Sequence, residues 1–215
     1  MVNHVLPLSQ LIASNVVATK EALMLCSSSC VPKKFVLVST ASVGKLGGYA
    51  ESKALAEVAA LEAERRGLNV RILRPGRIGP SFETGCFNDR DLLYRILLAC
   101  FLEQAAPSDP CAYVSLIPVD KCANAIVSNT GFTSIHVAWS TLCGHFKVLS
   151  DHQEWFRRVR NRVESDGVSH PLAQLLGKVK ERLPFESSSV GPVVEDEETK
   201  NWVEMFLKRI REQNK

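Results

Sequence analysis

The chain has 215 residues, of which 46% are apolar and 23% charged, a composition that fits one globular domain with or without an appendage. The net charge of +3 and the scattered Lys and Arg residues argue against a nucleic-acid-binding protein, and no run of about 18 apolar residues predicts a membrane span. The seven cysteines are odd in number and lack metal-ligand spacing, which favours reduced thiols in the cytoplasm and no metal site.

Helices and strands are expected to alternate along most of the chain. Apolar residues at helical spacing predict a helix over 8–24, and a continuous apolar run predicts a buried parallel strand over 35–38. An Ala- and Glu-rich segment predicts a helix over 49–66, which Gly67 ends. Then follow a strand over 70–73, a helix over 89–102, a strand over 113–117, a helix over 120–128 and a strand over 135–139. This order is typical of βαβ units in a doubly wound, mainly parallel sheet.

The C-terminal part of the chain reads as helical. Helices are expected from residue 151 onward, over 171–182 and over 195–213, with a Ser- and Gly-Pro-containing linker before the last. Asp91 and Asp120 are expected to cap helices, and Trp155 and Trp202 to pack inside the tail.

A tyrosine and a lysine four residues apart carry the clearest chemical signal. Tyr49 and Lys53 share one face at the start of a predicted helix, so the ammonium is expected near the phenol. The positive charge would lower the pKa of Tyr49 toward the range of an acid/base catalyst. Thr40, at the C-terminal end of a strand, could hold the carbonyl oxygen that Tyr49 protonates. The three residues predict hydride transfer to a carbonyl; the alternative is a strand end and a Tyr/Lys pair on a helix surface.

Several short motifs, in one order, resemble a known family. They are Val2-Asn3-His4-Val5-Leu6-Pro7, Asn15-Val16-Val17-Ala18-Thr19, Val38-Ser39-Thr40, Gly48-Tyr49-Ala50-Glu51-Ser52-Lys53, Arg74-Pro75-Gly76-Arg77-Ile78, the segment from Thr84 to Leu93, and Ile117-Pro118-Val119-Asp120. Together they cover roughly residues 2–127 and are similar to the thioester-reductase branch of the extended short-chain dehydrogenases. This branch comprises the terminal reductase domains of nonribosomal peptide and polyketide synthases, aminoadipate reductases and carboxylic acid reductases.

The resemblance implies a fold and an activity. The fold is α/β, with a partial Rossmann-like reductase domain at residues 1–145 and a helical substrate-side appendage at residues 146–215. The activity is NADPH- or NADH-dependent reduction of a carrier- or CoA-bound thioester to an aldehyde or alcohol.

The resemblance also implies roles for individual residues. The implied catalytic residues are Asn15, Thr40, Tyr49 and Lys53. The implied cofactor-binding residues are His4, Tyr49, Lys53, Pro75, Gly76 and Ile78, and the implied substrate-binding residues are Arg77 and Asn88. Plainer alternatives stay open: backbone hydrogen bonding for Asn15, solvation for His4 and Arg77, and helix capping for Asn88.

Two departures from the family pattern bear on activity. The sequence contains no G-x-x-G-x-x-G turn, which in such enzymes cradles the cofactor pyrophosphate at a helix N-terminus. Only residues 41–48 separate Thr40 from Tyr49, where the family places a few tens of residues, and they span at most about 28 Å. Such a short connection can displace Tyr49. The chain is therefore expected to be the C-terminal part of a reductase with an internal deletion.

Three functions stay open at this point. The first is thioester reduction, impaired in this chain unless the glycine-rich segment is supplied or dispensable. The second is a sugar-nucleotide epimerase or dehydrogenase, which shares Tyr-x-x-x-Lys but not the segment from Thr84 to Leu93. The third is a non-catalytic remnant or interaction module, in which a second copy or another partner covers an exposed sheet edge. The acyl group and the choice between NADPH and NADH are likewise open.

Overall fold

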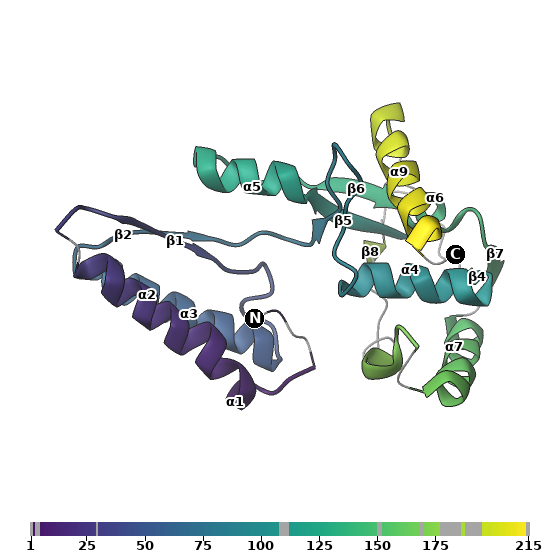
Figure 1. Ribbon diagram of the computed structural model, residues 1–215, viewed down its shortest axis with the longest axis horizontal. Coiled ribbons are helices and arrows are strands. Elements are labelled where there is room, and N and C mark those ends of the chain that lie inside the picture. The colour runs from purple at the N-terminus through teal and green to yellow at the C-terminus, as the bar shows by residue number, and fades with distance from the viewer. Residues whose placement is uncertain are drawn as a thin grey trace. The chain divides into compact units, whose positions relative to one another are not determined.

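The computed structural model describes residues 2, 5–28, 30–107, 112–149, 152–167, 170–176, 186–187 and 195–213. The chain divides into two compact units, Met1–Gly76 and Arg77–Lys215. Figure 1 traces the helices and strands of each unit along the chain. No helix in this described part of the chain is long and apolar enough to cross a bilayer.

The first unit is a βαβ arrangement with a second helix beside the crossover. Strands β1 (Lys34–Val38) and β2 (Asn69–Leu73) pair in parallel along their whole length, with Val38 opposite Leu73. Helix α3 (Gly48–Arg65) connects them, as a parallel pair requires. Figure 1 shows α3 lying alongside helix α2 (Ala18–Ser27), next to the two strands. The predicted strands and the predicted crossover helix are confirmed to within one residue.

The N-terminal helix is continuous but not uniform. Helix α1 (Leu8–Leu11) passes into a π-helical segment, η1 (Ile12–Val17), before α2 begins. The helix predicted over 8–24 is thus confirmed. Its π-helical segment was not predicted, because the spacing of apolar residues does not distinguish a π-helical turn from an α-helical one. π-Helical turns are rare and are frequent at functional sites.

The core of the first unit is small. Leu37 of β1 packs with Ala56 and Ala60 of α3, and partly buried Phe35, Val70 and Ile72 surround them. The two alanines have no side chain beyond Cβ, so α3 can approach the strands closely.

The second unit is built around one central strand. Strand β5 (Ala112–Pro118) pairs in parallel with β3 (Ile78–Gly79) and antiparallel with β6 (Ile135–Ala138) and β8 (Glu186–Ser187). A separate parallel pair joins β4 (Ala105–Pro107) to β7 (Lys147–Leu149). The sheet is mixed because helix α5 (Val119–Ser128) and the residues after it return the chain antiparallel to β5.

The remaining helices surround a large apolar core. They are α4 (Leu92–Glu103), α6 (Trp139–Cys143), α7 (His152–Asp166), the 3-10 turn η3 (Ala173–Leu175) and α9 (Glu197–Gln213). Of the helix predicted over 171–182, residues 177–182 lie outside the described residues. Asp91 caps α4 as predicted, because its carboxylate accepts the Leu93 amide at 2.8 Å.

All three tryptophans of the chain lie in this core. The indole N–H of Trp155 donates to the Ala105 carbonyl at 3.1 Å, and that of Trp202 donates to the Ser81 carbonyl at 3.0 Å. The predicted burial of these tail residues is confirmed, and helices α7 and α9 share one core with α4. The second unit extends from Arg77 to Lys215 and so includes residue 145, after which a domain boundary was predicted. That boundary stays a prediction.

Candidate active site

Two hydroxyls meet where the first unit's β1 ends and α3 begins. Tyr49 is buried, with 8% of its surface exposed, and its phenol shares a hydrogen bond with the Thr40 hydroxyl. Thr40 follows β1 directly, and Tyr49 is the second residue of α3. The strand end and the helix start thus bring together the two residues that sequence reasoning selected to hold one carbonyl oxygen.

The short loop between the two hydroxyls is a run of tight turns. The Val43 amide donates to the Thr40 carbonyl at 3.2 Å and the Lys45 amide to the Ser42 carbonyl at 3.0 Å. The Ala41 amide donates to the carbonyl of Pro75 at 3.0 Å, which fastens the loop to the end of β2. Because the loop closes this compactly, the shortened connection does not separate Tyr49 from Thr40.

Gly48 sets the close approach of the N-terminal segment to α3. A Cβ at Gly48 would lie 2.5 Å from the Leu8 amide nitrogen and 2.6 Å from the Leu6 carbonyl oxygen, both backbone atoms. Any larger residue would move either this segment or the first turn of α3, which carries Tyr49. Glycine is therefore a packing requirement of the candidate site.

The pKa of Tyr49 moves opposite to the sequence expectation. Burial raises it, and the hydrogen bond with Thr40 opposes this rise without cancelling it. The expected lowering by Lys53 is wrong, because desolvation of the phenolate outweighs the favourable interactions that reach it. Tyr49 is accordingly a protonated phenol at neutral pH, suited to donating a hydrogen bond or a proton.

Lys53 lies one turn beyond Tyr49 on α3, and its side chain reaches the end of β1. Its ammonium donates to the carbonyl oxygen of Val38 at 3.0 Å, two residues before Thr40. Burial lowers the pKa of Lys53, and the nearby Glu57 carboxylate opposes that shift. The cation is thereby directed to the strand end that carries the Thr40 hydroxyl.

Asn15 connects the π-helical turn to the same part of α3. Its side-chain amide donates to the Ser52 hydroxyl at 2.9 Å, and Ser52 donates to the backbone carbonyl of Tyr49 at 2.8 Å. Asn15 and Ser52 are both buried. The structure thus connects Asn15 through hydrogen bonds to the turn of α3 that carries Tyr49, while its predicted catalytic role stays a prediction.

An ion pair one helical turn beyond Lys53 was not predicted from the sequence. Glu57 is 3% exposed, and the Arg74 guanidinium donates to both of its carboxylate oxygens, with Nε to Oε1 at 2.9 Å. The hydrogen bond from Arg74 lowers the pKa of Glu57 against the effect of burial. A sequence signal existed: Tyr49, Lys53 and Glu57 follow each other at intervals of four on one helix face.

The other predicted site residues are divided between the two units. Pro75 is buried and Gly76 is exposed at the end of the first unit, and His4 lies outside the described residues. Arg77 and Ile78 begin the second unit, where the Arg77 carbonyl accepts the Ile117 amide at 2.8 Å.

Asn88 has a local structural role in the second unit. It is exposed, and its side-chain oxygen accepts the Arg90 amide at 3.0 Å. This Asx turn lies just before α4 and accounts for Asn88 locally. The cofactor and substrate roles implied for these residues stay predictions.

Asp120 does not cap a helix, contrary to the sequence expectation. The N-cap of α5 is Pro118, and Asp120 accepts the Ser81 hydroxyl at 2.9 Å and the Glu83 amide at 3.0 Å. Burial alone would raise its pKa, but hydrogen bonds from three backbone amides and from Ser81 lower it to about 2. The carboxylate therefore fastens a turn more than thirty residues upstream, a contact that local sequence does not reveal.

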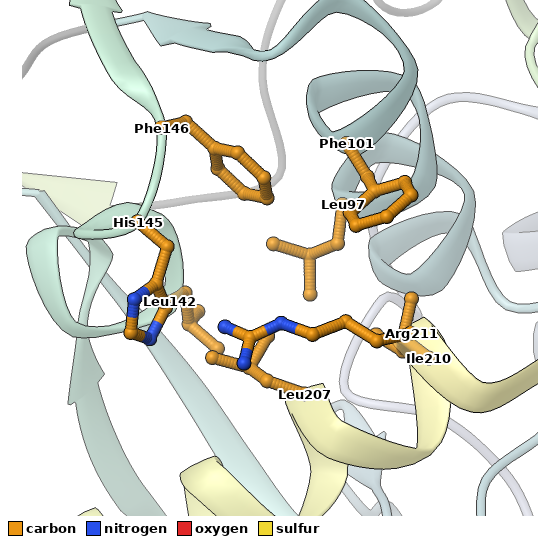
Figure 2. A pocket seen from close by; sticks show the side chains of 8 residues that line it. All are labelled: Leu97, Phe101, Leu142, His145, Phe146, Leu207, Ile210 and Arg211. Atoms are coloured by element: carbon orange, nitrogen blue, oxygen red, sulfur yellow. The ribbon is translucent and has the colours of Figure 1, made fainter. Parts of the chain in front are cut away.

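Two hollows lie in the described part of the second unit, and their linings do not include a predicted site residue. The apolar hollow in Figure 2 has a volume of about 10 Å³, room for roughly one water molecule. Its lining consists of leucine, isoleucine and phenylalanine side chains from several elements, together with His145 and Arg211. A wider hollow of about 290 Å³ is lined by Asp89, Tyr94, Arg95, Leu98, His170, Pro171 and Gln174.

Comparison with known proteins identifies the family. The sequence profile of the family described as Male sterility protein matches residues 1–47 and 42–126, which is more than half of the chain. The chain belongs to the Male sterility protein family. The two matched segments overlap at residues 42–47, in the loop between Thr40 and Tyr49, and the shortened loop predicted there stays a prediction.

Two curated relatives are named as reductase subunits, and the matched segments are a small part of each. The L-2-aminoadipate reductase large subunit of Penicillium chrysogenum is 30% identical over 181 residues, which cover 67% of this chain and 12% of that protein. The Eremothecium gossypii subunit of the same name is 39% identical over 100 residues, which cover 45% of this chain and 7% of that protein.

Solved structures show the same relationship in three dimensions. The terminal R domain of the myxalamid PKS-NRPS pathway superposes with a TM-score of 0.79 at 25% identity, over 99% of this chain and 66% of that one. The PhqB reductase domain from Penicillium fellutanum gives a TM-score of 0.74 at 21% identity, over 96% and 65%. The resemblance inferred from the motifs and the Rossmann-like α/β class are confirmed. This family member spans about two thirds of those domains.

Proposed function

We propose that this chain contributes the carbonyl-activating half of an NAD(P)H-dependent reductase that acts on a carrier- or CoA-bound thioester. The observation that carries the proposal is the hydrogen-bonded pair of Thr40 and Tyr49 hydroxyls with the Lys53 ammonium at the same strand end. The similarity to terminal reductase domains and aminoadipate reductases supports the thioester as substrate class.

The proposed roles follow from the chemistry of each group. Bound NADPH or NADH would supply a hydride to the thioester carbonyl carbon. The Thr40 and Tyr49 hydroxyls would donate hydrogen bonds to the oxygen as it becomes negative, and a protonated Tyr49 suits that role. Collapse of the tetrahedral species reforms the C=O bond, breaks the C–S bond and releases a thiolate, which takes up a proton. The product is an aldehyde.

The residues fit one end of the cofactor better than the other. Lys53 and Tyr49 offer a cation and a hydroxyl of the kind that the nicotinamide ribose can bind. The sequence has no glycine-rich turn for the pyrophosphate, which is where a helix N-terminus normally contributes binding energy. We therefore expect the chain by itself to bind NADPH weakly.

A titration of NADPH into the purified chain tests the proposal. NADPH fluorescence is the better signal, because all three tryptophans lie in the second unit and the candidate site lies in the first. We expect saturable binding that Lys53→Met weakens more than Tyr49→Phe does, and oxidation of NADPH by an acyl-CoA that Tyr49→Phe abolishes. Absence of binding up to millimolar NADPH, from a chain shown to be folded by circular dichroism, contradicts it.

A second candidate is a non-catalytic interaction module. The missing glycine-rich turn favours it, as does the first unit's sheet, which has two strands in the described part of the chain and therefore two outer edges. The same titration separates the two candidates, since a module without a cofactor site gives no saturable signal and no difference between Lys53→Met and the parent chain.

A further inference from the structure

The outward face of α3 carries apolar side chains where a solvent-facing helix normally carries polar ones. Ala56 and Ala60 pack toward the strands. On the other side of the helix, Leu55, Val58 and Leu61 are 44%, 63% and 48% exposed. Residues three apart are neighbours on a helix surface, so the three side chains form one stripe. Single exposed apolar residues are ordinary, but a continuous apolar patch marks an interaction surface.

The stripe is symmetric about its central residue. Leu55 lies three residues before Val58, and Leu61 lies three residues after it. Glu51 lies seven residues before Val58 and Arg65 seven residues after it. Seven residues make close to two helical turns, so both charges lie on the outward face with Val58. An acid at one end and a base at the other make this face complementary to a second copy that runs in the opposite direction.

Both charges can accept one more contact. The Glu51 carboxylate accepts the Gly47 amide at 3.2 Å through Oε1, and among the described residues its Oε2 has no partner. The Arg65 side chain is 78% exposed and its Nη1 lies 3.0 Å from a carboxylate oxygen of Glu62. A guanidinium has five N–H donors, so this pair does not use up its capacity. Neither charge has to leave its present partner to meet a second copy.

We propose that the outward face of α3 is a contact between two copies of this chain, which lie antiparallel about a two-fold axis at Val58. The axis places Val58 against its own copy, Leu55 against Leu61 of the partner subunit, and Glu51 against Arg65 of the partner subunit. Two-fold dimers use one surface twice in this way. With one helix from each copy the interface is small, so we expect weak association, with a Kd on the order of 10–100 µM.

The competing explanation is that the charges serve α3 alone. An acid in the first turn and a base in the last turn stabilise a helix through its dipole, and the apolar stripe then stays in water. This explanation predicts a monomer at all concentrations. The proposal uses neither cofactor nor substrate, so its outcome is independent of whether the chain binds NADPH.

Sedimentation velocity of the purified chain from about 5 to 500 µM tests the proposal. We expect a dimer that forms with rising concentration and that Val58→Arg abolishes, because the change sets two guanidinium groups against each other on the axis. Val127→Arg is the matched control, at an 86% exposed position on α5, and should leave the dimer unchanged. A parent chain that stays monomeric, or a dimer that Val58→Arg does not weaken, overturns the proposal.

Exchange of the two charges tests the antiparallel arrangement. Glu51→Arg and Arg65→Glu should each weaken association about tenfold, because each change alters two symmetric contacts. The double variant should restore association, since opposite charges again face each other across the axis. Circular dichroism checks that each variant is folded. A double variant as weak as the single ones overturns the proposal.

A cysteine on the axis keeps the test decisive if a charged variant does not fold. Val58→Cys lies opposite its own copy, within the range that a disulfide can span. After mild oxidation, non-reducing electrophoresis should show a linked dimer above the background that the exposed Cys30 and Cys86 give in the parent chain. Val127→Cys should give the background alone. Equal amounts of linked dimer in the two variants overturn the proposal.

Discussion

The interactions that stabilise the first unit internally differ from those that stabilise the second. The apolar cluster of the first unit has three buried members among the described residues, Leu37, Ala56 and Ala60, whereas that of the second unit has more than twenty and includes three tryptophans. The first unit also has polar contacts made by buried side chains, such as Asn15 with Ser52 and Glu57 with the exposed Arg74. The free energy gained by burying apolar surface is roughly proportional to the buried area and does not depend on direction. Hydrogen bonds and ion pairs, in contrast, depend on the distance and angle between the two groups.

The difference explains where the candidate chemistry lies. The triad of Thr40, Tyr49 and Lys53 belongs entirely to the unit with the small core. Its side chains are placed by directional contacts at the ends of β1 and α3, which define geometry more strictly than apolar packing does. We expect changes in the second unit to alter stability most, and changes in the first unit to alter the site most.

The largest effect is expected for Trp202→Ala in the second unit. The change removes a side chain that is 2% exposed together with its hydrogen bond to Ser81, and should lower the free energy of unfolding by about 3–5 kcal/mol. Urea denaturation followed by circular dichroism measures it, with Val127→Ala at an 86% exposed position as control. Equal loss of hydrogen-exchange protection in β1 and β5 would argue against two units of different stability.

A smaller effect, confined to the first unit, is expected for Gly48→Ala. The new Cβ meets backbone atoms of Leu6 and Leu8, so the first turn of α3 must shift, at a cost of about 1–3 kcal/mol. Hydrogen exchange of the α3 amides reports the change. Gly131→Ala is the control, because nothing lies within 4 Å of its Cβ position. If both variants behave alike, the close approach at Gly48 is not a constraint.

A pH-dependent effect is expected for Asp120→Asn in the second unit. The pKa of Asp120 is about 2 in the folded chain, below the roughly 3.9 of an unfolded Asp. Its contribution is therefore present above about pH 4 and is lost as the pH falls through 2. We expect the variant to lose about 1–2 kcal/mol at neutral pH, with the difference from the parent chain shrinking below pH 4 in urea titrations. A difference that does not depend on pH would contradict the ionised role.

The smallest effect is expected for Asp91→Ala. Loss of the cap on the Leu93 amide should cost about 1 kcal/mol of stability and leave the first unit unchanged. Thermal unfolding of Asp91→Ala beside Asp89→Ala, an exposed neighbour two residues earlier, measures it. Equal midpoints for the two variants would show that the cap does not contribute.

Much of the fold was predictable because its determinants are local. The residue patterns that predict β1, α3 and β2 lie within each of these segments. The observed bounds differ from the predicted ones by one residue. The antiparallel direction of β6 was not predictable, because it depends on which strand edge the returning chain reaches. Strands β3, β4, β7 and β8 were missed because they have two or three residues, too few to show a pattern.

For the candidate site, the sequence by itself determined which hydroxyls and which cation stand together, because Thr40, Tyr49 and Lys53 are close along the chain. Only the tertiary structure decided their state. Burial raises the pKa of Tyr49, the Val38 carbonyl receives Lys53, and Arg74 pairs with Glu57 across seventeen positions. The reason is physical: spacing sets which side chains share a face, but desolvation and long-range pairing exist only once the chain has packed.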